Sequence, residues 1–241
     1  GVELHLINVH ELLDALRIAV VSNVHCYFVG YYNVHHAVAA WQNQSLRNYL
    51  NSLDILHSDG IGMYISSLVL YGSDGLPEKV NGTDFYPLLL QEAERSQWKV
   101  FFLGDSHATI NQLRHVVANE YPGLNSVGYH HGYFDNDDVT LLQMIKDASP
   151  DILFVGMGLQ KQMEWIQLHR DYLKSSVRVC LMVGGGIGYI ARTRSRAPEI
   201  FQLLGLEWLF RLCSNPRYYW HRYLVGIPYF CYFVIRQKLK L

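Results

Sequence analysis

One carboxylate in the front half of the chain has neighbours suited to acid–base chemistry. Asp59 stands near the close of a short apolar stretch, residues 55–62, and is followed by Gly60 and, after one residue, by Gly62. Glycines leave room for a ligand, and a carboxylate in such a position can take a proton from an attacking hydroxyl group. The spacing alone favours a structural role, in which Asp59 caps the helix that follows it. On the residues themselves, both interpretations stay open.

Two glycine clusters further along the chain are suited to binding phosphate. Gly156 and Gly158 form one, and the run from Gly184 to Gly186 forms the other. Their backbone N–H groups can approach an anion closely, and a helix that starts after the first cluster adds positive potential there. Neither cluster has the spacing of a dinucleotide-binding or Walker motif, so no cofactor and no ATP site is predicted. Tight turns between a strand and a helix explain the same glycines equally well.

The histidines and serines form no recognisable catalytic group. The twelve histidines include two doublets, His35 with His36 and His130 with His131. Adjacent side chains point about 100° apart on a helix and to opposite sides of a strand, so neither doublet forms a chelating pair and no metal site is predicted. The sequence has no G-x-S-x-G elbow, so a serine hydrolase is not supported either.

The composition excludes several classes of protein. The chain has 241 residues, of which 50% are hydrophobic, and this is enough for one sizeable core and argues against a disordered or fibrous protein. A net charge of -1 argues against a general electrostatic grip on nucleic acid. The four cysteines lie far apart, which fits a reducing, cytoplasmic setting, and the first residues show no signal-peptide pattern.

The near-neutral overall charge hides a basic and aromatic C-terminal segment. From residue 208 to the end there is no Asp or Glu, while six Lys or Arg and ten aromatic residues are present. Such a segment is predicted to lie at a membrane surface, although a helix packed on the domain is the alternative. Its apolar run, residues 223–235, is too short to span a bilayer. Pro228 predicts two short helices, or a helix and an irregular end.

Alternating apolar runs and helical spacings predict an α/β fold with a mainly parallel sheet. The apolar runs expected to form strands are residues 24–31, 98–103, 151–155 and 177–183, and a weaker, short apolar stretch covers residues 55–62. Residues 33–50, after the first run, show the spacing of apolar residues typical of a helix. Ser106 is expected to cap the helix that follows the run at residues 98–103. Ligands bind outside the carboxyl ends of such strands, so one crevice is expected to be surrounded by Asp59, Gly104, Gly158 and Gly185.

Several short stretches occur in an order and spacing typical of one enzyme family. They are Asp59-Gly-Ile-Gly62, Val80-Asn-Gly-Thr-Asp84, Phe101-Phe-Leu-Gly104, Tyr121-Pro-Gly123, Gly132-Tyr-Phe134, residues 150–158, Lys161-Gln162 with Trp165-Ile166, Arg196-Ala-Pro198 and residues 205–209. Each is weak alone, but together they extend over nearly the whole chain. On these residues the chain resembles the WecG/TagA/CpsF family of bacterial glycosyltransferases, also called glycosyltransferase family 26.

The resemblance implies a Rossmann-like core, residues 1–206, followed by a membrane-facing C-terminal appendage, residues 207–241. It implies an inverting, metal-independent transfer from a UDP-sugar to a saccharide carried on a polyprenyl diphosphate, in bacterial polysaccharide or cell-wall assembly. The sugar would be N-acetylmannosamine, its uronic acid or glucose. The expected place of action is the cytoplasmic face of the inner membrane, as a peripheral protein. No nucleic acid partner is expected, and self-association is left open.

The resemblance also implies roles for individual residues of this sequence. Asp59 corresponds to the proposed catalytic base, and Asn33 corresponds to a contact with the acceptor. Arg217 and Arg222 correspond to appendage cations that would stabilise the diphosphate leaving group. The further substrate-binding candidates are Lys79, Asp84, Gly158, Lys161, Gln162 and Gly185.

Departures from the family pattern keep a second hypothesis open. Tyr31 stands where a Thr is usual, Lys79 replaces an Arg and loses its bidentate fork, and Gly188 replaces an Asp expected near the donor. Three arginines between residues 192 and 196 add cations in that region. These changes predict an altered choice of donor or acceptor. The alternative is a non-catalytic protein, derived from this family, that binds a nucleotide or a lipid phosphate.

Overall fold

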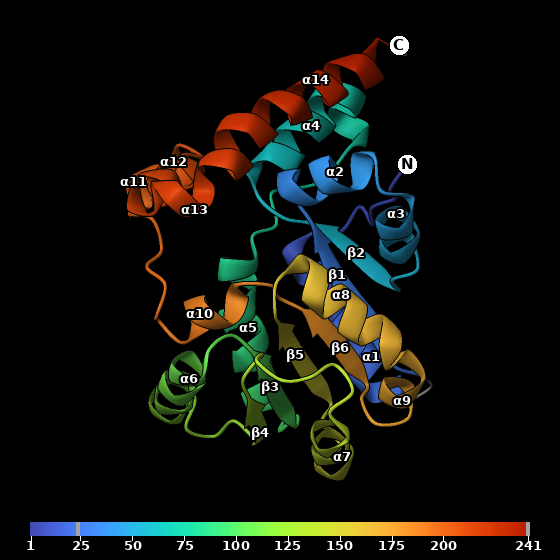
Figure 1. Ribbon diagram of the computed structural model, residues 1–241, viewed down its shortest axis with the longest axis vertical. Helices are drawn as coiled ribbons and strands as arrows, with labels where there is room; N and C mark the ends of the chain where they lie inside the picture. The colour runs from blue at the N-terminus through green and yellow to red at the C-terminus, as the bar shows by residue number, and fades with distance from the viewer. Residues whose placement is uncertain (23–24, 240–241) are drawn as a thin grey trace.

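The protein is an α/β structure built on one parallel sheet, with helices on both faces (Figure 1). The computed structural model describes residues 1–22 and 25–239. Within these residues six strands are ordered β2-β1-β6-β5-β3-β4, and all neighbouring strands are parallel. They are β1 (Tyr27–Tyr32), β2 (Ile55–Ser58), β3 (Val100–Gly104), β4 (Ser126–His130), β5 (Ile152–Gly156) and β6 (Val179–Met182). The predicted α/β fold is confirmed.

The strands formed by continuous apolar runs lie where the sequence predicts them. Every residue of β2, β3, β5 and β6 is buried, as expected for strands covered by helices on both faces. The first predicted strand begins at residue 24, which lies outside the described residues, and β1 begins at Tyr27. The edge strand β4 was not predicted, because its five residues are only partly buried and contain no continuous apolar run.

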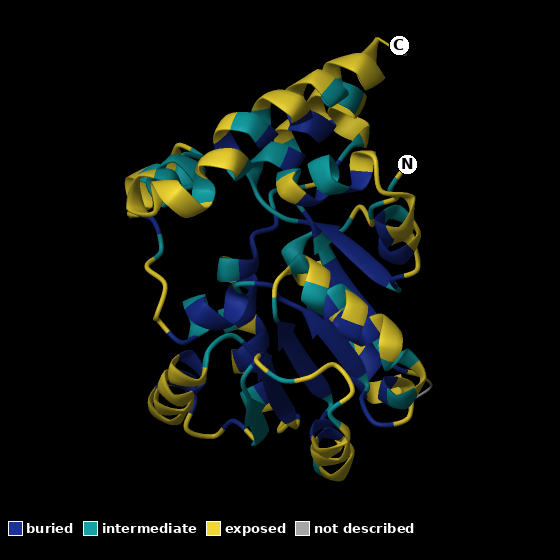
Figure 2. Ribbon diagram, viewed as in Figure 1, coloured by how far each residue is buried: buried dark blue, intermediate teal, exposed yellow. Residues whose placement is uncertain are grey.

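Helices cover the two faces of the sheet in separate layers. Because successive side chains of a strand point to opposite faces, Phe102 packs on one side of β3 and Leu103 on the other. The side of Phe102 is covered by α1 (Val9–Ser22), α5 (Gly82–Arg95), α6 (His107–Glu120) and α10 (Gly186–Ile190). The side of Leu103 is covered by α3 (Gln44–Asn51), α7 (Val139–Ala148), α8 (Leu159–Leu168) and α9 (Arg170–Lys174). The inner sides of these helices are buried (Figure 2).

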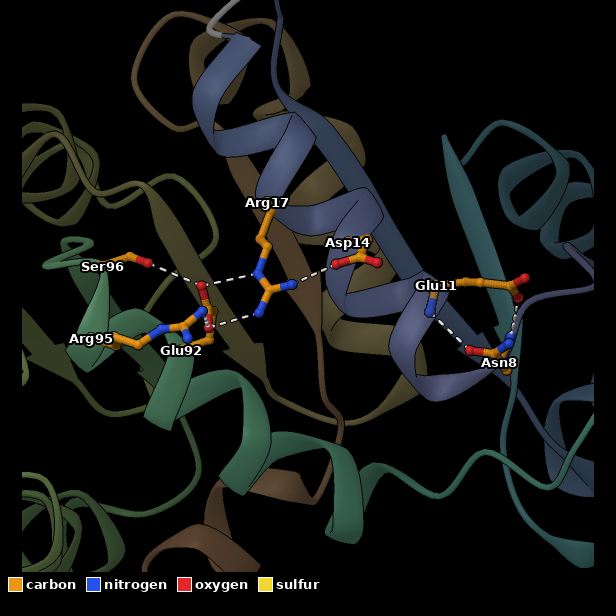
Figure 3. Close-up of polar contacts among 7 residues, drawn as sticks. All are labelled: Asn8, Glu11, Asp14, Arg17, Glu92, Arg95 and Ser96. Atoms are coloured by element: carbon orange, nitrogen blue, oxygen red, sulfur yellow. Dashed lines mark hydrogen bonds and ion pairs between the residues drawn. The ribbon is translucent and has the colours of Figure 1, made fainter.

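Helices α1 and α5 are joined on their face of the sheet by a bidentate ion pair (Figure 3). Nε and Nη2 of Arg17 donate to the two carboxylate oxygens of Glu92, each over 2.9 Å. Glu92 also accepts from Arg95 and Ser96, and its side chain is only 7% exposed. The hydrogen bond from Arg17 lowers the pKa of Glu92 to about 2. This contact fixes α5, whose opposite end lies at the candidate site.

The C-terminal segment is helical and packs on two helices from the first third of the chain, α2 (Val34–Trp41) and α4 (Ile61–Tyr71) (Figure 1). Its elements are α11 (Glu199–Leu203), α12 (Glu207–Ser214), α13 (Pro216–Trp220), the π-helical turn η2 (His221–Val225) and α14 (Gly226–Lys238). The ring of Phe233 stacks on Trp41 with centroids 3.9 Å apart, and Phe230 is buried. The segment therefore docks on the core through aromatic contacts.

The helix is not interrupted at Pro228, which lies inside α14, and the change in helix geometry comes earlier, at residues 221–225. The wider π-helical turn η2 directly precedes α14 and accommodates the proline in the first turn of that helix. The last two residues of the predicted appendage, 240 and 241, lie outside the described residues. Among the helices of the described chain, none combines the length and the apolar character needed to cross a bilayer.

Candidate active site

The carboxyl ends of four adjacent strands bring several candidate residues to one edge of the sheet. Asp59 directly follows β2, Asn33 follows β1, Gly185 follows β6, and Gln162 lies in the helix after β5. All strands are parallel, so their carboxyl ends lie at the same edge. Of the four residues expected to surround one crevice, Asp59, Gly104, Gly158 and Gly185, all lie at this edge, but only Asp59 lines the cavity described below.

Two hydrogen-bond donors hold the carboxylate of Asp59. Nδ2 of Asn33 donates to Oδ2 over 3.3 Å, and the backbone N–H of Gly82 donates to Oδ1 over 3.2 Å. Asn33 caps α2, since its Oδ1 accepts from the backbone N–H of His36, and this turns its NH₂ group toward Asp59. Gly60, not Asp59, is the N-cap residue of α4. The helix-capping interpretation is therefore wrong for α4, and Asp59 is oriented by α2 and by the first residue of α5.

A cavity of about 640 Å³ lies beside Asp59 and is bounded on one side by the appendage. Its polar wall combines one end of the parallel sheet with residues of α12 and η2. The polar residues that line it are Asn33, His35, Asp59, Ser66, Lys79, Asn81, Gln202, Glu207, Arg211 and Arg222. Carboxylates and cations thus face the same space.

The two arginines of this wall each lie near an aromatic ring, and burial changes the pKa of its histidine. Arg211 pairs with Glu207 over 3.3 Å, and its guanidinium lies 5.2 Å from the centre of the Tyr189 ring. Arg222 lies over the ring of Tyr223 at 5.6 Å. Burial, followed by the charge of Arg222, lowers the pKa of His35 to about 4. At neutral pH His35 is therefore uncharged, and it lies in the same wall as Asp59 and the two arginines.

A second polar cluster lies where β1, β5 and β6 end. Gln162 is 1% exposed, and its Oε1 accepts from the backbone N–H of Gly184 over 3.2 Å. A Cβ at Gly184 would collide with the hydroxyl of Tyr31, and the φ of +53° there also favours glycine. Burial, and next the negative charge of Asp59, raise the pKa of Tyr31. Tyr31 therefore packs against Gly184 and lies within the electrostatic influence of Asp59.

Comparison with known proteins identifies the family. The model of the Glycosyl transferase WecG/TagA/CpsF family matches residues 1–241. The chain belongs to this family. Two relatives from Staphylococcus aureus, strains MW2 and NCTC 8325 / PS 47, are each 32% identical over 204 residues, covering 84% of this chain and 77% of the relative. Both are named N-acetylglucosaminyldiphosphoundecaprenol N-acetyl-beta-D-mannosaminyltransferase.

The family assignment makes the chain a glycosyltransferase and confirms the resemblance drawn from its short motifs. It favours the enzyme over the non-catalytic binding protein. Within this glycosyltransferase, four of the predicted site residues line the cavity, and they are Asn33, Asp59, Lys79 and Arg222. These four come from separate parts of the sequence, and the fold brings them together.

Other predicted site residues of the glycosyltransferase lie elsewhere. Asp84 pairs with Arg196, with 2.6 Å between Oδ1 and Nη2. Lys161 donates to the carbonyl oxygen of Phe134 over 3.1 Å and lies over its ring. Arg217 is exposed on α13 and is not part of the cavity wall. The side chains of Asp84, Lys161 and Arg217 therefore lie outside the cavity wall.

The two glycine candidates mark turns at the carboxyl ends of β5 and β6. Gly158 is the N-cap residue of α8, with a φ of +80° and open space where a side chain would stand. Gly185 is the N-cap residue of α10, and the Arg194 side chain lies directly against it. Gly158 therefore leaves the backbone accessible, which is the property that the sequence suggested for binding phosphate, whereas Arg194 fills the space beside Gly185.

Three residues of the cavity wall were not predicted from the sequence. Asn81 caps α5 and donates from Nδ2 to Glu207 over 3.2 Å, which ties α5 to the appendage. Both residues lie within stretches that match the family, and this match was the only feature of the sequence that pointed to a role for them. Arg211 was counted only as one charge of the basic tail, although it faces the cavity.

One histidine of each doublet bonds to a backbone carbonyl oxygen, while His35 of the first doublet lines the cavity. His36 is buried, its ring lies 4.7 Å from that of Tyr31, and its Nδ1 bonds to the Tyr31 carbonyl oxygen over 2.8 Å. His130 bonds through Nδ1 to the carbonyl oxygen of His131 over 2.8 Å. Over residues 1–22 and 25–239, no three His, Cys, Asp or Glu side chains are grouped so that they could hold a metal ion.

Proposed function

We propose that this glycosyltransferase moves N-acetylmannosamine from its UDP derivative to a saccharide carried on a polyprenyl diphosphate. The Staphylococcus aureus relatives are named for transfer of an N-acetyl-β-D-mannosaminyl group to an N-acetylglucosaminyl diphosphoundecaprenol. The observation that carries the proposal is the cavity that brings Asp59 together with Arg211 and Arg222. A base for an acceptor hydroxyl and cations for a departing diphosphate are the two groups that such a transfer needs.

Asp59 acts as the general base in this mechanism. Its carboxylate takes the proton of the acceptor hydroxyl while that oxygen attacks the anomeric carbon of the donor. The bond from this carbon to UDP breaks on the opposite side, and its electron pair leaves with UDP, so the configuration inverts. Asn33 and the N–H of Gly82 each occupy one oxygen of Asp59, and the remaining lone pairs stay available for the proton.

The departing UDP gains negative charge, which arginine and lysine side chains offset. Arg211 and Arg222 approach from the appendage and Lys79 from the core, and all three line the cavity with Asp59. Fixed cations in a partly closed site stabilise a developing anion without reorganisation. Metal independence is part of the proposal and rests on these three side chains.

The appendage also acts as the contact with the membrane. Trp220, Tyr229 and Tyr232 are each more than half exposed, and α14 ends with Arg236 and Lys238. Exposed aromatic rings and basic residues favour the headgroup region of an anionic bilayer. This supports a peripheral protein on the cytoplasmic face of the inner membrane, with residues 1–206 as the core and 207–241 as the appendage.

Replacement of the base tests the proposal directly. Sugar transfer from a panel of UDP-sugars to N-acetylglucosaminyl diphosphopolyprenol is measured with the intact chain, with Asp59→Asn and with Asp171→Asn, a control on the exposed surface of α9. Asp59→Asn is expected to reduce kcat by about 10²- to 10⁴-fold and the control to leave it unchanged. Transfer by Asp59→Asn at the wild-type rate would disprove the base. UDP binding by the wild type without transfer would support the non-catalytic alternative.

A further inference from the structure

Two helices turn apolar stripes toward the same cavity. The stripes share a spacing of four residues: Ile61, Ile65 and Val69 on α4, and Ile227, Cys231 and Ile235 on α14. Residues four apart lie on one side of a helix, so each helix presents one face to the cavity. We call the space between these six side chains the α4–α14 groove.

Both stripes begin at the charged end of the cavity. Helix α4 starts two residues after Asp59, and α14 starts four residues after Arg222. At the other end, Gln237 donates to the hydroxyl of Tyr71 over 3.0 Å, and Lys238 donates to the carbonyl oxygen of Leu70 over 3.3 Å. The two helices therefore run side by side in the same direction (Figure 1). Each stripe extends about 12 Å away from the charged end.

The protein leaves much of this apolar surface uncovered. Ile65, Val69 and Ile235 are 52%, 48% and 57% exposed. Helix α4 contains no charged residue over its eleven positions. A continuous apolar surface that adjoins a polar pocket is typical of a ligand site, because exposing it to water costs free energy that a bound hydrocarbon recovers.

We infer that the α4–α14 groove binds the first isoprene units of the acceptor's polyprenyl chain. The inference rests on the proposed function, which brings a saccharide on a polyprenyl diphosphate to Asp59. The groove belongs to the same cavity as Asp59, so an acceptor whose saccharide lies at Asp59 places its hydrocarbon between the two stripes. The polar end of the cavity complements the saccharide and its diphosphate, and the apolar end complements the isoprenoid.

A hydrocarbon in this position also joins the appendage to the core. One wall of the groove belongs to α4 of the core and the other to α14 of the appendage. Burial of an isoprenoid against both walls stabilises the arrangement in which Arg222 faces Asp59. The acceptor lipid thus helps to complete the site at which its own saccharide reacts.

The chain contains a thiol probe for the groove and a matched control. Cys231 is exposed and lines the groove, Cys213 is exposed on α12 away from the cavity wall, and Cys26 and Cys180 are buried. N-acetylglucosaminyl diphosphate carrying a farnesyl chain, without detergent or bilayer, should slow alkylation of Cys231 by about tenfold or more. Alkylation of Cys213 should stay unchanged. A dimethylallyl chain, which is too short to reach along the groove, should protect Cys231 much less.

Unchanged alkylation of Cys231 in the presence of the farnesyl compound would overturn the inference. Equal protection by the farnesyl and dimethylallyl compounds would also overturn it, because the headgroup alone would then explain the effect. The measurement requires no sugar transfer and no donor. It therefore decides the groove even if the proposed donor is wrong.

Substitutions in α4 give a second test with a control on the same helix. Ile65→Glu places a charge in the groove, whereas Leu68→Glu places it at a position that is 43% exposed and outside the cavity wall. Ile65→Glu should reduce the preference for the farnesyl over the dimethylallyl acceptor, measured as the ratio of their kcat/KM values, by about tenfold. Leu68→Glu should keep the wild-type ratio, and thermal melting checks that both variants are folded.

An unchanged ratio for folded Ile65→Glu would contradict the groove. An equal fall of the ratio in Leu68→Glu would also contradict it and would indicate that the whole surface of α4 contacts lipid. A wild type that transfers sugar to neither acceptor counts against the proposed function, and the alkylation of Cys231 then decides the groove.

Discussion

Arginines serve different purposes in the segment after α10 and in the appendage. The arginines after α10 are each paired with a carboxylate of another element: Arg192 with Glu120 over 2.6 Å, Arg194 with Asp105 over 3.1 Å, and Arg196 with Asp84 over 2.6 Å. In the appendage, Arg211 and Arg222 line the cavity that contains Asp59, and Arg211 also pairs with Glu207 of its own helix. The first group anchors the segment that leads to the appendage, and under the proposed function the second group meets the ligand.

This difference shows that the number of basic residues is a poor guide to a phosphate site. The sequence predicts that the three arginines after α10 add cations near the donor. Because each has a carboxylate partner, their charges are largely balanced within the protein. Partly exposed pairs of this kind contribute little stability on their own, but they set geometry. Under the proposed function, the charge offered to a diphosphate comes instead from the basic residues of the cavity wall.

The largest effect that separates the two uses of arginine is expected from Arg222→Gln. Loss of one fixed donor to a developing anion typically reduces the rate by about 10²- to 10³-fold, so kcat/KM for sugar transfer should fall by that amount. Arg217→Gln, five residues earlier in the same appendage, removes the same charge from an exposed position outside the cavity. Steady-state kinetics with both variants would refute the proposed role of Arg222 if the two lost equal activity.

A smaller effect is expected from Gln162→Leu, in the polar cluster where β1, β5 and β6 end, because the resemblance to the family suggests a substrate contact there. Gln162 is buried and accepts from the N–H of Gly184, so its loss leaves that N–H without this partner, at a cost of about 1–3 kcal/mol. The KM for the UDP-sugar should rise about tenfold, and the unfolding midpoint in urea should fall. Gln160→Leu alters an exposed amide on the same helix and is the control. Unchanged donor KM in Gln162→Leu would separate this residue from the donor site.

Local sequence signals predicted the parts of the fold that depend on local interactions. Ser106 caps α6 and accepts from the backbone N–H of Thr109 over 3.1 Å, as its place after an apolar run indicated. The buried strands were visible because a parallel strand covered on both faces is apolar throughout. The edge strand β4 lacks that pattern, since part of its surface faces solvent.

The candidate site was only partly predictable, because its wall depends on contacts between distant segments. Asp59 and Asn33 stand directly after strands, so their positions followed from the alternation of apolar runs and turns. The bond from Asn81 to Glu207 joins residues 126 positions apart, and no local pattern reveals it. The helical phase of the tail depends on how η2 and α14 dock, and this phase directs Arg211 and Arg222, not Arg217, to the cavity.

The smallest effect on activity, but a clear effect on stability, is expected from Glu92→Gln. Glu92 lies in the α1–α5 ion pair, away from the cavity, so sugar transfer should stay at the wild-type level while the urea midpoint at neutral pH falls. The hydrogen bond from Arg17 lowers the pKa of Glu92 in the folded state from 4.5 to about 2. The folded state therefore binds fewer protons here than the unfolded state. The resulting stabilisation is complete above pH 4.5 and is lost as the pH falls toward 2.

Urea unfolding of Glu92→Gln and of the wild type, from neutral pH downward, measures this dependence on pH. The gap between their midpoints should be widest at neutral pH and should narrow below pH 4.5. Glu164→Gln, at an exposed position on α8, should follow the wild type throughout. A gap that stays constant down to acidic pH would mean that Glu92 stabilises the protein through packing and not through its charge. A loss of transfer in Glu92→Gln would mean that the α1–α5 ion pair also positions Gly82, whose N–H holds Asp59.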